Sequence, residues 1–410
     1  MSETAAREVD VAIVGAGPAG AAAAIAFSRR GMSVVMLERS LFPRDKICGD
    51  FLTPGAVARL RELGEGAVEA ASPWTLRGMR ITFEGRDVLS DFPPARDGWS
   101  LSRRSLDAAL ARRAVAAGAE LVERIRVDRF GLERDGARWV EASHPDGTRQ
   151  RWRARLLVEA GGRHGPIARR VGWRVDDRHL RRFALWSQME GVSGLSERGE
   201  MHVFEGGYVG VAPLAPGDGE SAAANVTMVL TPERMARARG DAGGYFLDVL
   251  RRHPELGRRL AAARLLAPVR GLGPLACSAR RLGGRGLALV GDACGFVDPF
   301  TGEGVFMALE SGRLLAEALS GPPAAGDALD RALDQYERSW RAAFTSKYRL
   351  CRLLQVVIAR PWLARHVARA LGSRKDLADR MVGATGDLLP ASSVLNPSYL
   401  GRVLLAGMTG

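Results

Sequence analysis

The sequence of 410 residues predicts an α/β protein in which a parallel-sheet domain is interrupted by an antiparallel sheet and followed by a helical C-terminal region. Three observations predict this fold class. The segment 9–38 reads as strand, glycine-rich turn, helix and strand, as a βαβ unit does. Residues 183–230 hold short runs of alternating apolar and polar side chains, which are typical of antiparallel strands. From Leu329 onward the pattern is mainly helical, with Pro361 as a breaker.

The first βαβ unit carries an informative turn. Its opening strand, residues 9–14, is a β-branched apolar run of the kind found in buried parallel strands. The following helix ends at Gly31, and the second strand is closed by Glu38. The turn holds three glycines in GxGxxG spacing: Gly15, Gly17 and Gly20. Strand, glycines, helix and terminal acid together predict a dinucleotide-binding site.

Each residue of this motif has a physical role. Gly15 permits the tight turn, Gly17 lets the backbone approach a pyrophosphate, and Gly20 lets helix and strand pack closely. The helix N-terminus offers free N–H groups and its positive dipole end to the phosphates. Glu38 is the acid expected to accept the ribose hydroxyls. The bare pattern recurs at 271–276, but a proline lies inside it and no alanine-rich helix follows, so a loop is expected there.

The remaining elements follow in order. Ser102 or Ser105 caps a helix that runs to about Ala117, and a strand is expected over 120–127. A hairpin turns at Asp146-Gly147, with strands at 140–143 and 150–156, and a buried strand follows at 156–160. Further strands are expected at 183–190, 200–204, 208–213, 225–230 and 287–290, and helices at 232–263 and 304–319. The segment 320–328, rich in alanine, proline and glycine, is the best domain boundary.

These elements predict a parallel-sheet domain assembled from three separate segments. Its parts are expected at 1–75, 99–180 and 271–328. The substrate domain, which would cover a pocket with its antiparallel sheet, is expected at 76–98 and 181–270, and the C-terminal helical region at 329–410.

Composition narrows the class of protein. No apolar run approaches the roughly 20 residues of a membrane span, and residues 1–10 have neither a basic nor an apolar leader region. A cytoplasmic protein is therefore expected, either free or associated with a membrane surface. The four cysteines are scattered without a CxxC pair, so they are expected to be free thiols rather than disulfides or metal ligands.

The net charge of +13 raises the question of nucleic-acid binding. The arginines are spread along the whole chain and few aromatic residues lie among them, so no nucleic-acid partner is expected. The segment 338–375 is more informative about a binding partner than the net charge, because it is basic and contains no acidic residue. Its apolar positions are Leu350, Leu353, Leu354, Val357 and Ile358. They indicate a contact with a membrane surface or an acyl-carrier partner, or else a packed helix with a solvated basic face.

Four further segments carry recognisable patterns. Residues 42–56 contain K-x-C-G-D before a threonine–proline turn, and Arg103 to Asp107 read R-x-x-L-D at a helix start. Residues 160–165 read A-G-G-R-H-G, and 291–304 read G-D-A-x-G and then D-P-x-x-G-E-G. With the βαβ unit, they resemble flavin-dependent oxidoreductases of the para-hydroxybenzoate hydroxylase superfamily, most closely its geranylgeranyl reductase-like and flavin monooxygenase branch. The resemblance covers about 8–320 and implies a Rossmann-type FAD-binding domain with an inserted substrate domain.

The resemblance also assigns residues to parts of FAD. It implies that Arg44, Cys48, Gly49 and Asp50 lie along the flavin, with Cys48 near the isoalloxazine ring. The same motifs imply that Arg103 contacts the flavin, that Val127 lies near the adenine, that Asp292 binds the ribityl chain, and that Gly302, Gly304 and Val305 present N–H groups to the N1–C2 edge of the flavin. Further cofactor positions implied by these motifs are Pro18, Ala19, Arg39, Ala160, Gly161, Gly291 and Pro299. Where the family has an aspartate and a serine near the pyrophosphate, this chain has Gly161 and Gly165.

A single βαβ fingerprint leaves NAD(P)H without a domain of its own. It is therefore expected to dock transiently as the reductant, or a separate partner reduces the flavin. The substrate is expected to be a hydrophobic small molecule in an apolar pocket above the ring.

Three reactions remain open: oxygen transfer by a monooxygenase, double-bond reduction on an isoprenoid or polyketide, and halogenation. Residues 207–213 resemble G-Y-x-W-x-F-P of prenyl reductases and G-W-x-W-x-I-P of halogenases, but Gly210 and Ala212 replace the second and third aromatic positions. The wider pocket argues against a halogenase and favours a monooxygenase of secondary metabolism that acts on a bulky aromatic or polyketide-like substrate. A Cys48 thiol near the ring favours the reductase instead, because a thiol can donate a proton. Cys48 and Tyr208 are the candidate catalytic residues.

Overall fold

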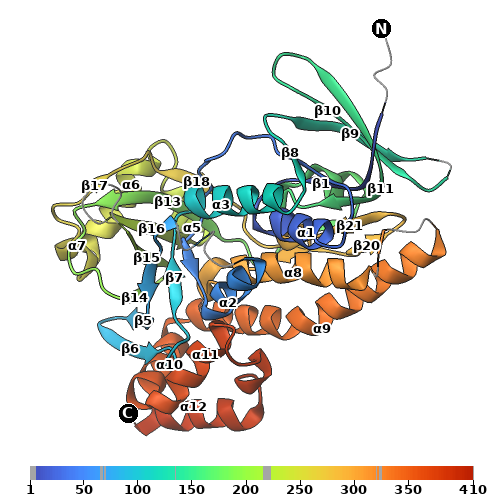
Figure 1. Cartoon of the computed structure of the whole chain (residues 1–410). Coiled ribbons are helices and arrows are strands. Elements are labelled where there is room, and N and C mark those ends of the chain that lie inside the picture. The colour runs from blue at the N-terminus through green and yellow to red at the C-terminus, as the bar shows by residue number, and fades with distance from the viewer. Residues whose placement is uncertain are drawn as a thin grey trace.

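Parallel strands form the centre of the first of two main sheets in the computed structural model (Figure 1). The model describes residues 6–64, 68, 71–133, 135–215, 223–319, 321–322 and 326–409. The strands run in the order β21 (Leu287–Leu289), β11 (Arg149–Glu159), β1 (Arg7–Val14), β2 (Val34–Leu37) and β8 (Glu120–Val122). Val11, Ala12 and Ile13 of β1 are fully buried, as the continuous apolar run predicts for a strand covered on both faces. The boundary expected at 320–328 and the expected N-terminus at 1–10 lie partly outside the described residues.

Helices cover one face of this sheet and strands cover much of the other. Val11 and Ile13 pack against α1 (Pro18–Ser28), α3 (Arg103–Ala116) and α8 (Gly304–Ala318). The opposite face packs against the antiparallel strands β9 (Arg126–Leu132) and β10 (Arg138–Ser143); β10 pairs with β11, and β9 pairs with β10.

Three sequence expectations about strands are corrected. The strand expected at 120–127 is split into β8 and β9, because Arg124 adopts a left-handed backbone and Ile125 N–H donates to the Glu38 carbonyl. The strands expected at 150–156 and 156–160 are one continuous strand, β11. The loop expected at 271–276 begins as part of β18 (Arg270–Leu272), which pairs with β13.

A second sheet lies beside the first. Its order is β17 (Arg264–Leu265), β13 (Phe183–Glu190), β16 (Ala223–Leu230), β15 (Gly207–Leu214), β14 (Arg198–Phe204), β5 (Gly78–Phe83) and β6 (Arg86–Asp91). The expected alternation within 183–230 thus forms antiparallel strands, and the later β14 pairs in parallel with the early β5. The outer face packs against α5 (Pro232–Ala236), α6 (Ala242–Arg252) and α7 (Leu256–Arg259).

The C-terminal region is helical, as expected. Its elements are α9 (Asp327–Ile358), α10 (Pro361–Ser373), α11 (Lys375–Thr385) and α12 (Pro397–Thr409). Helix α9 packs along α8, and the last three helices lie beneath the β5–β6 hairpin (Figure 1). Leu350, Leu354 and Ile358 are buried there, so the apolar face expected on 338–375 packs inward.

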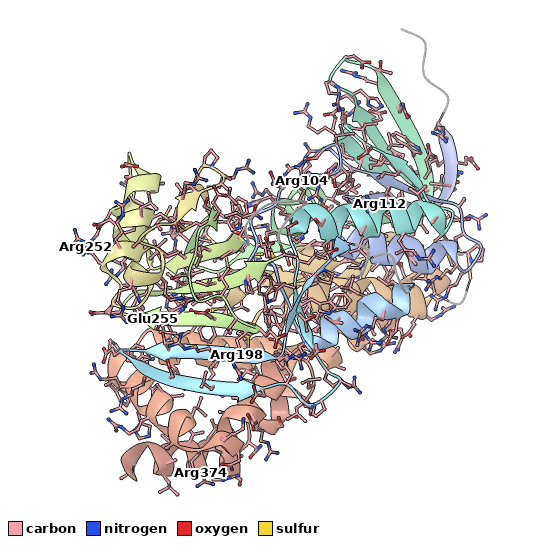
Figure 2. All side chains as sticks on the ribbon, turned by 60° about the vertical axis from the view of Figure 1, so that its left-hand side comes forward. Arg104, Arg112, Arg198, Arg252, Glu255 and Arg374 are labelled. Carbon is pink, nitrogen blue, oxygen red and sulfur yellow. The ribbon has the colours of Figure 1, made fainter. Side chains whose placement is uncertain are left out.

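Short elements complete the chain: α2 (Pro54–Leu63), α4 (Pro166–Arg170), β3 (Phe51–Leu52), β4 (Trp74–Leu76), β7 (Gly98–Ser100), β12 (Arg174–Asp176), β19 (Cys277–Ala279), β20 (Gly283–Gly284) and β22 (Gly295–Phe296). Arginine side chains are distributed over all parts of the molecule, as the labelled Arg104, Arg198, Arg252 and Arg374 illustrate (Figure 2). Within the described ranges, no helix combines the length and the apolarity needed to cross a membrane.

Candidate functional site

A cavity of about 800 Å³ lies between the two sheets. This volume falls within the range of cofactor and ligand sites. Its lining includes nearly all the predicted site residues: Gly15, Gly17, Pro18, Ala19, Glu38, Arg39, Arg44, Cys48, Gly49, Arg103, Val127, Ala160, Gly161, Asp292, Pro299, Gly302, Gly304, Val305 and Tyr208. Gly20 and Gly291 do not line it and support its wall instead. A Cβ on Gly20 would lie 2.0 Å from the Gly15 carbonyl oxygen, and one on Gly291 would lie 2.7 Å from Ala19 Cβ.

One end of the cavity concentrates positive charge beside the glycine turn. Asp107, which is fully buried, accepts hydrogen bonds from Arg103 Nε at 2.6 Å and from an Arg44 terminal nitrogen at 2.9 Å. A Cβ on Gly17 would lie 3.7 Å from Arg44 and 3.8 Å from Arg103. One carboxylate thus orients two guanidinium groups toward the place where Gly17 leaves space. This is the chemistry that a pyrophosphate requires.

Glu38 lies at the end of β2, as the motif predicts. Its Oε2 accepts the backbone N–H of Ala16 at 3.0 Å, and its Oε1 accepts that of Ser40 at 3.1 Å. These bonds fix the carboxylate at the cavity wall. Val127 lines the same cavity from β9, where the adenine is expected.

Helix N-termini reach the cavity without a side-chain cap. Helices α2 and α3 are capped by Thr53 and Ser102, but α1 and α8 begin at Gly17 and Glu303 with no side-chain hydrogen bond. Uncapped N–H groups and the positive dipole end favour an anionic ligand at both places. The spacing of the glycines, the paired arginines and these two helix ends fit FAD; the N-terminus of α1 would hold its pyrophosphate and that of α8 its flavin.

Glu159 explains why this chain has Gly161 and Gly165 where the family has an aspartate and a serine. Glu159 is fully buried and accepts the backbone N–H groups of Gly161 and Ile167, both at 2.8 Å. A Cβ on Gly161 or Gly165 would lie 2.6 or 2.5 Å from its carboxyl group. Glycine is therefore needed at both positions. Burial raises the pKa of Glu159 to about 7, against the opposing effect of these backbone hydrogen bonds.

Cys48 is partly exposed to the cavity and is held by the second sheet. Asn225 Nδ2, on β16, donates to the Cys48 carbonyl at 2.9 Å and to Asp50 Oδ2 at 2.7 Å. Thr227 Oγ1 adds a weaker bond to the Cys48 carbonyl at 3.3 Å. Burial raises the pKa of the Cys48 thiol, although Arg103 opposes this shift, so the sulfur keeps its proton at neutral pH.

Tyr208 places its ring at the cavity and its hydroxyl on Asp298. The hydroxyl donates to Asp298 Oδ1 at 2.5 Å, and the ring meets Phe300 edge-on at 5.1 Å. Burial and the Asp298 charge raise the pKa of Tyr208 well above its usual range, and burial raises the pKa of Asp298 to about 6. The phenol is therefore neutral, and its proton is engaged by Asp298.

A narrow apolar cavity of about 90 Å³ adjoins the main one. Both are lined by Phe51, Met79, Met201, Phe300 and Thr301. The narrow cavity continues between the β5–β6 hairpin and the C-terminal helices, where Leu354 and Val367 are among its lining residues. Because its walls are almost entirely aliphatic or aromatic, it suits an unbranched or methyl-branched hydrocarbon chain.

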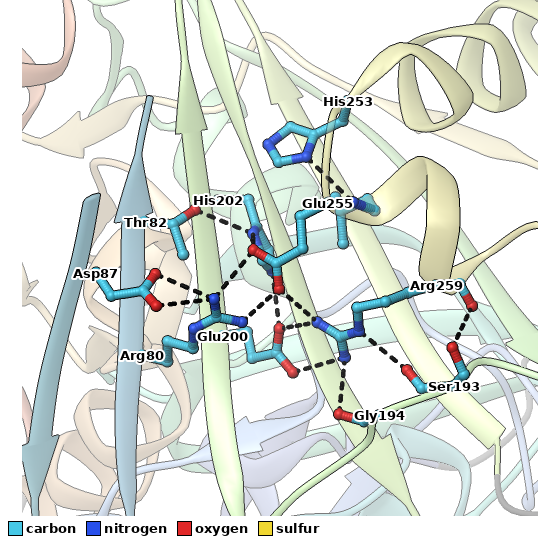
Figure 3. Close-up of polar contacts among 11 residues, drawn as sticks. Arg80, Thr82, Asp87, Ser193, Gly194, Glu200, His202, His253, Glu255 and Arg259 are labelled. Carbon is cyan, nitrogen blue, oxygen red and sulfur yellow. Dashed lines mark hydrogen bonds and ion pairs between the residues drawn. The ribbon is translucent and has the colours of Figure 1, made fainter. Parts of the chain in front are cut away.

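A polar network borders the main cavity at Glu200 (Figure 3). Glu200 pairs with Arg259 at 2.6 Å and with His202 Nε2 at 2.8 Å, while Glu255 pairs with Arg80. Glu200, His202 and Glu255 are residue types that can bind a metal ion, but each of the two carboxylates already forms an ion pair with an arginine. The network therefore fixes β14 against α7, and no metal site is assigned to it.

Several cavity residues were not predicted as site residues. Lys46, Met201, Phe296 and Phe300 line it, while Asn225 and Asp298 support its wall. Lys46 and Asp298 lie within the quoted K-x-C-G and D-P-x-x-G-E-G motifs, which is a signal for both. Met201 and Asn225 lie on strands whose pairing partners cannot be read from a single segment.

Known proteins resemble this chain in sequence and fold. Residues 8–210 match the FAD binding domain family. The chain is 30% identical over 348 residues to menaquinone reductase of Mycobacterium tuberculosis, covering 82% of each chain. It is 26% identical to digeranylgeranylglycerophospholipid reductase of Methanosarcina mazei, over 81% of this chain and 80% of that one.

Solved structures agree on the fold. A flavoprotein/dehydrogenase from Cytophaga hutchinsonii superposes with a TM-score of 0.82 at 20% identity, with 98% of both chains covered. The myxobacterial chondrochloren halogenase gives 0.79 at 21% identity, covering 98% of this chain and 97% of that one. The sequence matches, the cavity and the shared fold together place this chain among the FAD-dependent oxidoreductases of the para-hydroxybenzoate hydroxylase superfamily.

Proposed function

We propose that this protein is an FAD-dependent reductase that saturates a carbon–carbon double bond in the isoprenoid chain of a lipid-soluble substrate, such as a polyprenylated quinone. The observation that carries the proposal is the narrow apolar cavity that shares five lining residues with the main cavity. A hydrocarbon chain lying across both would bring one of its double bonds to the Cys48 side of the cavity. The named activities of the menaquinone and digeranylgeranylglycerophospholipid reductases support the same substrate class.

The chain's own residues divide the work of this reaction. Bound FAD in its reduced form supplies two electrons as a hydride, and one proton completes the addition across the double bond. Cys48 is the proposed proton donor, because its thiol is protonated and faces the cavity. Asn225 positions Cys48 through its backbone carbonyl. Transiently docked NAD(P)H, or a partner protein, is the proposed source of the electrons.

A monooxygenase is the second candidate, and it is the one that the sequence favours. Gly210 and Ala212 line the main cavity and leave it wide, which favours a bulky substrate for oxygen transfer. We place the reductase first because the apolar extension and the position of Cys48 both suit hydrogen addition to a chain. A halogenase is placed last, since Gly210 stands where halogenases carry a tryptophan.

Mixing chemically reduced holoenzyme with oxygen in a stopped-flow instrument separates the two candidates. The reductase predicts that oxygen alone reoxidises the flavin slowly and with no spectroscopic intermediate, whereas a polyprenylated quinone reoxidises the flavin by accepting its electrons. A rapidly formed, oxygen-dependent absorbance transient that substrate accelerates would instead establish the monooxygenase.

A further inference from the structure

Two adjacent helices at the end of the molecule opposite the N-terminus expose large apolar side chains (Figure 1). On α12, Leu404, Leu405 and Met408 are 54%, 67% and 76% exposed. Their spacing places them on one side of the helix, while Tyr399 and Val403 on the other side are buried. On α10, Trp362 is 63% exposed. These four residues are called here the apolar face.

The two helices present this face together because they are bonded side by side. A ring nitrogen of His366, on α10, lies 2.8 Å from the Leu404 carbonyl, and Arg369 donates to the Gly407 carbonyl at 2.9 Å. Trp362 precedes His366 by four residues, which places it one helical turn away on the same side of α10. Trp362 is therefore on the side of α10 that faces α12.

The charge around the apolar face is positive. Helices α10 and α12 contain no acidic residue. Arg365 pairs with Glu84, and Arg402 pairs with Asp376 at the rim. Arg360 and Arg369 have no carboxylate partner within the described residues and donate to backbone carbonyls instead. An exposed apolar strip with an excess of guanidinium groups is complementary to a partner whose outer layer is anionic and whose interior is apolar.

We propose that the apolar face binds the surface of an anionic lipid bilayer, with Trp362, Leu404, Leu405 and Met408 entering the headgroup region and the arginines contacting lipid phosphates. The helices lie on the bilayer and do not cross it. Helix α10 also lines the narrow cavity through Ala364, Val367, Ala368 and Leu371, so this orientation brings that cavity close to the bilayer. The proposal goes beyond the proposed reaction, since vesicle binding does not require catalysis.

Co-sedimentation of the full-length holoenzyme with vesicles tests the proposal. Vesicles of phosphatidylcholine with phosphatidylglycerol are compared with vesicles of phosphatidylcholine alone, at low and high salt. The wild type is expected to bind the anionic vesicles, and less so as salt rises. The double variant Leu405→Gln, Met408→Gln is expected to bind at least about tenfold more weakly, because two exposed side chains no longer enter the bilayer. Trp362→Ala, on the other helix, is expected to weaken binding too.

The matched control is Val115→Gln on α3, a 48% exposed apolar side chain on the FAD-binding domain. It is expected to bind like the wild type. Bound FAD and the thermal unfolding midpoint report that each variant is folded. The proposal is overturned if the wild type does not bind anionic vesicles, if the double variant binds them as well as the wild type, or if the control loses as much binding as the double variant. It is also overturned if the wild type is a dimer that the double variant dissociates, since a second copy would then cover the apolar face.

Discussion

Asn225, at the centre of the antiparallel sheet, donates its side-chain amide to the carbonyl of Cys48, 177 residues earlier in the chain. The same amide reaches Asp50 Oδ2. One fully buried side chain thus ties the substrate sheet to the segment that carries the proposed proton donor. The position of the thiol depends on both domains.

Asn225→Leu is expected to lower the free energy of unfolding by about 1–3 kcal/mol, because it removes the amide donor that the Cys48 carbonyl and buried Asp50 Oδ2 share. It is also expected to raise the alkylation rate of Cys48, since the segment loses an anchor. Thr227→Val removes the 3.3 Å bond to Cys48 and the 2.9 Å bond to Asn225 Oδ1 but keeps the Asn225 amide donor, so it provides the graded comparison. Urea unfolding and mass spectrometry of alkylated protein measure both effects. Equal effects of the two variants would contradict the assigned role of Asn225.

Lys347→Met is expected to destabilise the protein by about 3–5 kcal/mol. Lys347 Nζ lies 2.5 Å from both Glu303 Oε1 and Asp387 Oδ1, so the variant leaves two buried carboxyl groups without a cation. Lys375→Met is the control, because the Lys375 side chain is 65% exposed and its ammonium pairs with Asp379 at the surface. Denaturant unfolding should show a change of less than about 0.5 kcal/mol for the control. A comparable loss in both variants would argue against a special role for the buried triad.

The buried Glu159 predicts that stability falls as pH rises. Its pKa is raised to about 7 in the folded protein by burial, against an ordinary value of 4.5. The folded state therefore binds more protons than the unfolded state between these values, and the free energy of unfolding declines across that window, on the order of 1–3 kcal/mol. Glu159→Gln, which carries no titrating proton, is expected to reduce this decline. Urea unfolding from pH 5 to pH 7.5 measures the free energy of unfolding of both proteins. If it falls with pH as steeply in the variant as in the wild type, a group other than Glu159 causes the decline.

Cys48→Ala is expected to lower the rate of double-bond reduction by at least about a hundredfold, the ordinary contribution of a general acid. Bound FAD is expected to remain. Cys277→Ala, a buried thiol behind the cavity wall, is the control and should keep the wild-type rate. Single-turnover kinetics with reduced holoenzyme measure the effect. Only a modest loss in Cys48→Ala would favour the monooxygenase.

Gly210→Trp is expected to fold and hold FAD but to raise KM at least about tenfold, because the indole occupies the substrate side of the cavity. The atoms nearest to a Cβ at Gly210 belong to Met201 and Thr227 and lie at 3.5 Å and beyond, so the backbone accepts a side chain there. Gly210→Ala is the matched control and should turn over normally. A Trp variant with unchanged KM would show that the substrate lies elsewhere.

Structural features that depend on residues close together in the sequence could be predicted from it. The glycine turn, the N-cap at Ser102 and the alternating strands of 183–230 are each encoded within a short segment, and the structure contains them. The family motifs also predicted that two segments far apart in the sequence line one cavity, and Gly17 and Gly304 both line it.

Long-range pairing was beyond such reasoning. No local pattern indicates that β14 pairs in parallel with β5, that Asn225 holds Cys48, or that Lys347 neutralises Glu303. The exposed side of α12 was missed for a related reason. Its apolar residues resemble those of a core helix until the packing of Tyr399 and Val403 shows which side is covered.

The most direct test of the proposed function is an anaerobic single turnover of reduced holoenzyme with a polyprenylated quinone. A reductase is expected to reoxidise its flavin without oxygen and to give a product that, by mass spectrometry, has gained two hydrogens in its isoprenoid chain. A flavin that stays reduced until air is admitted, together with a product that has gained oxygen, would contradict the proposed function.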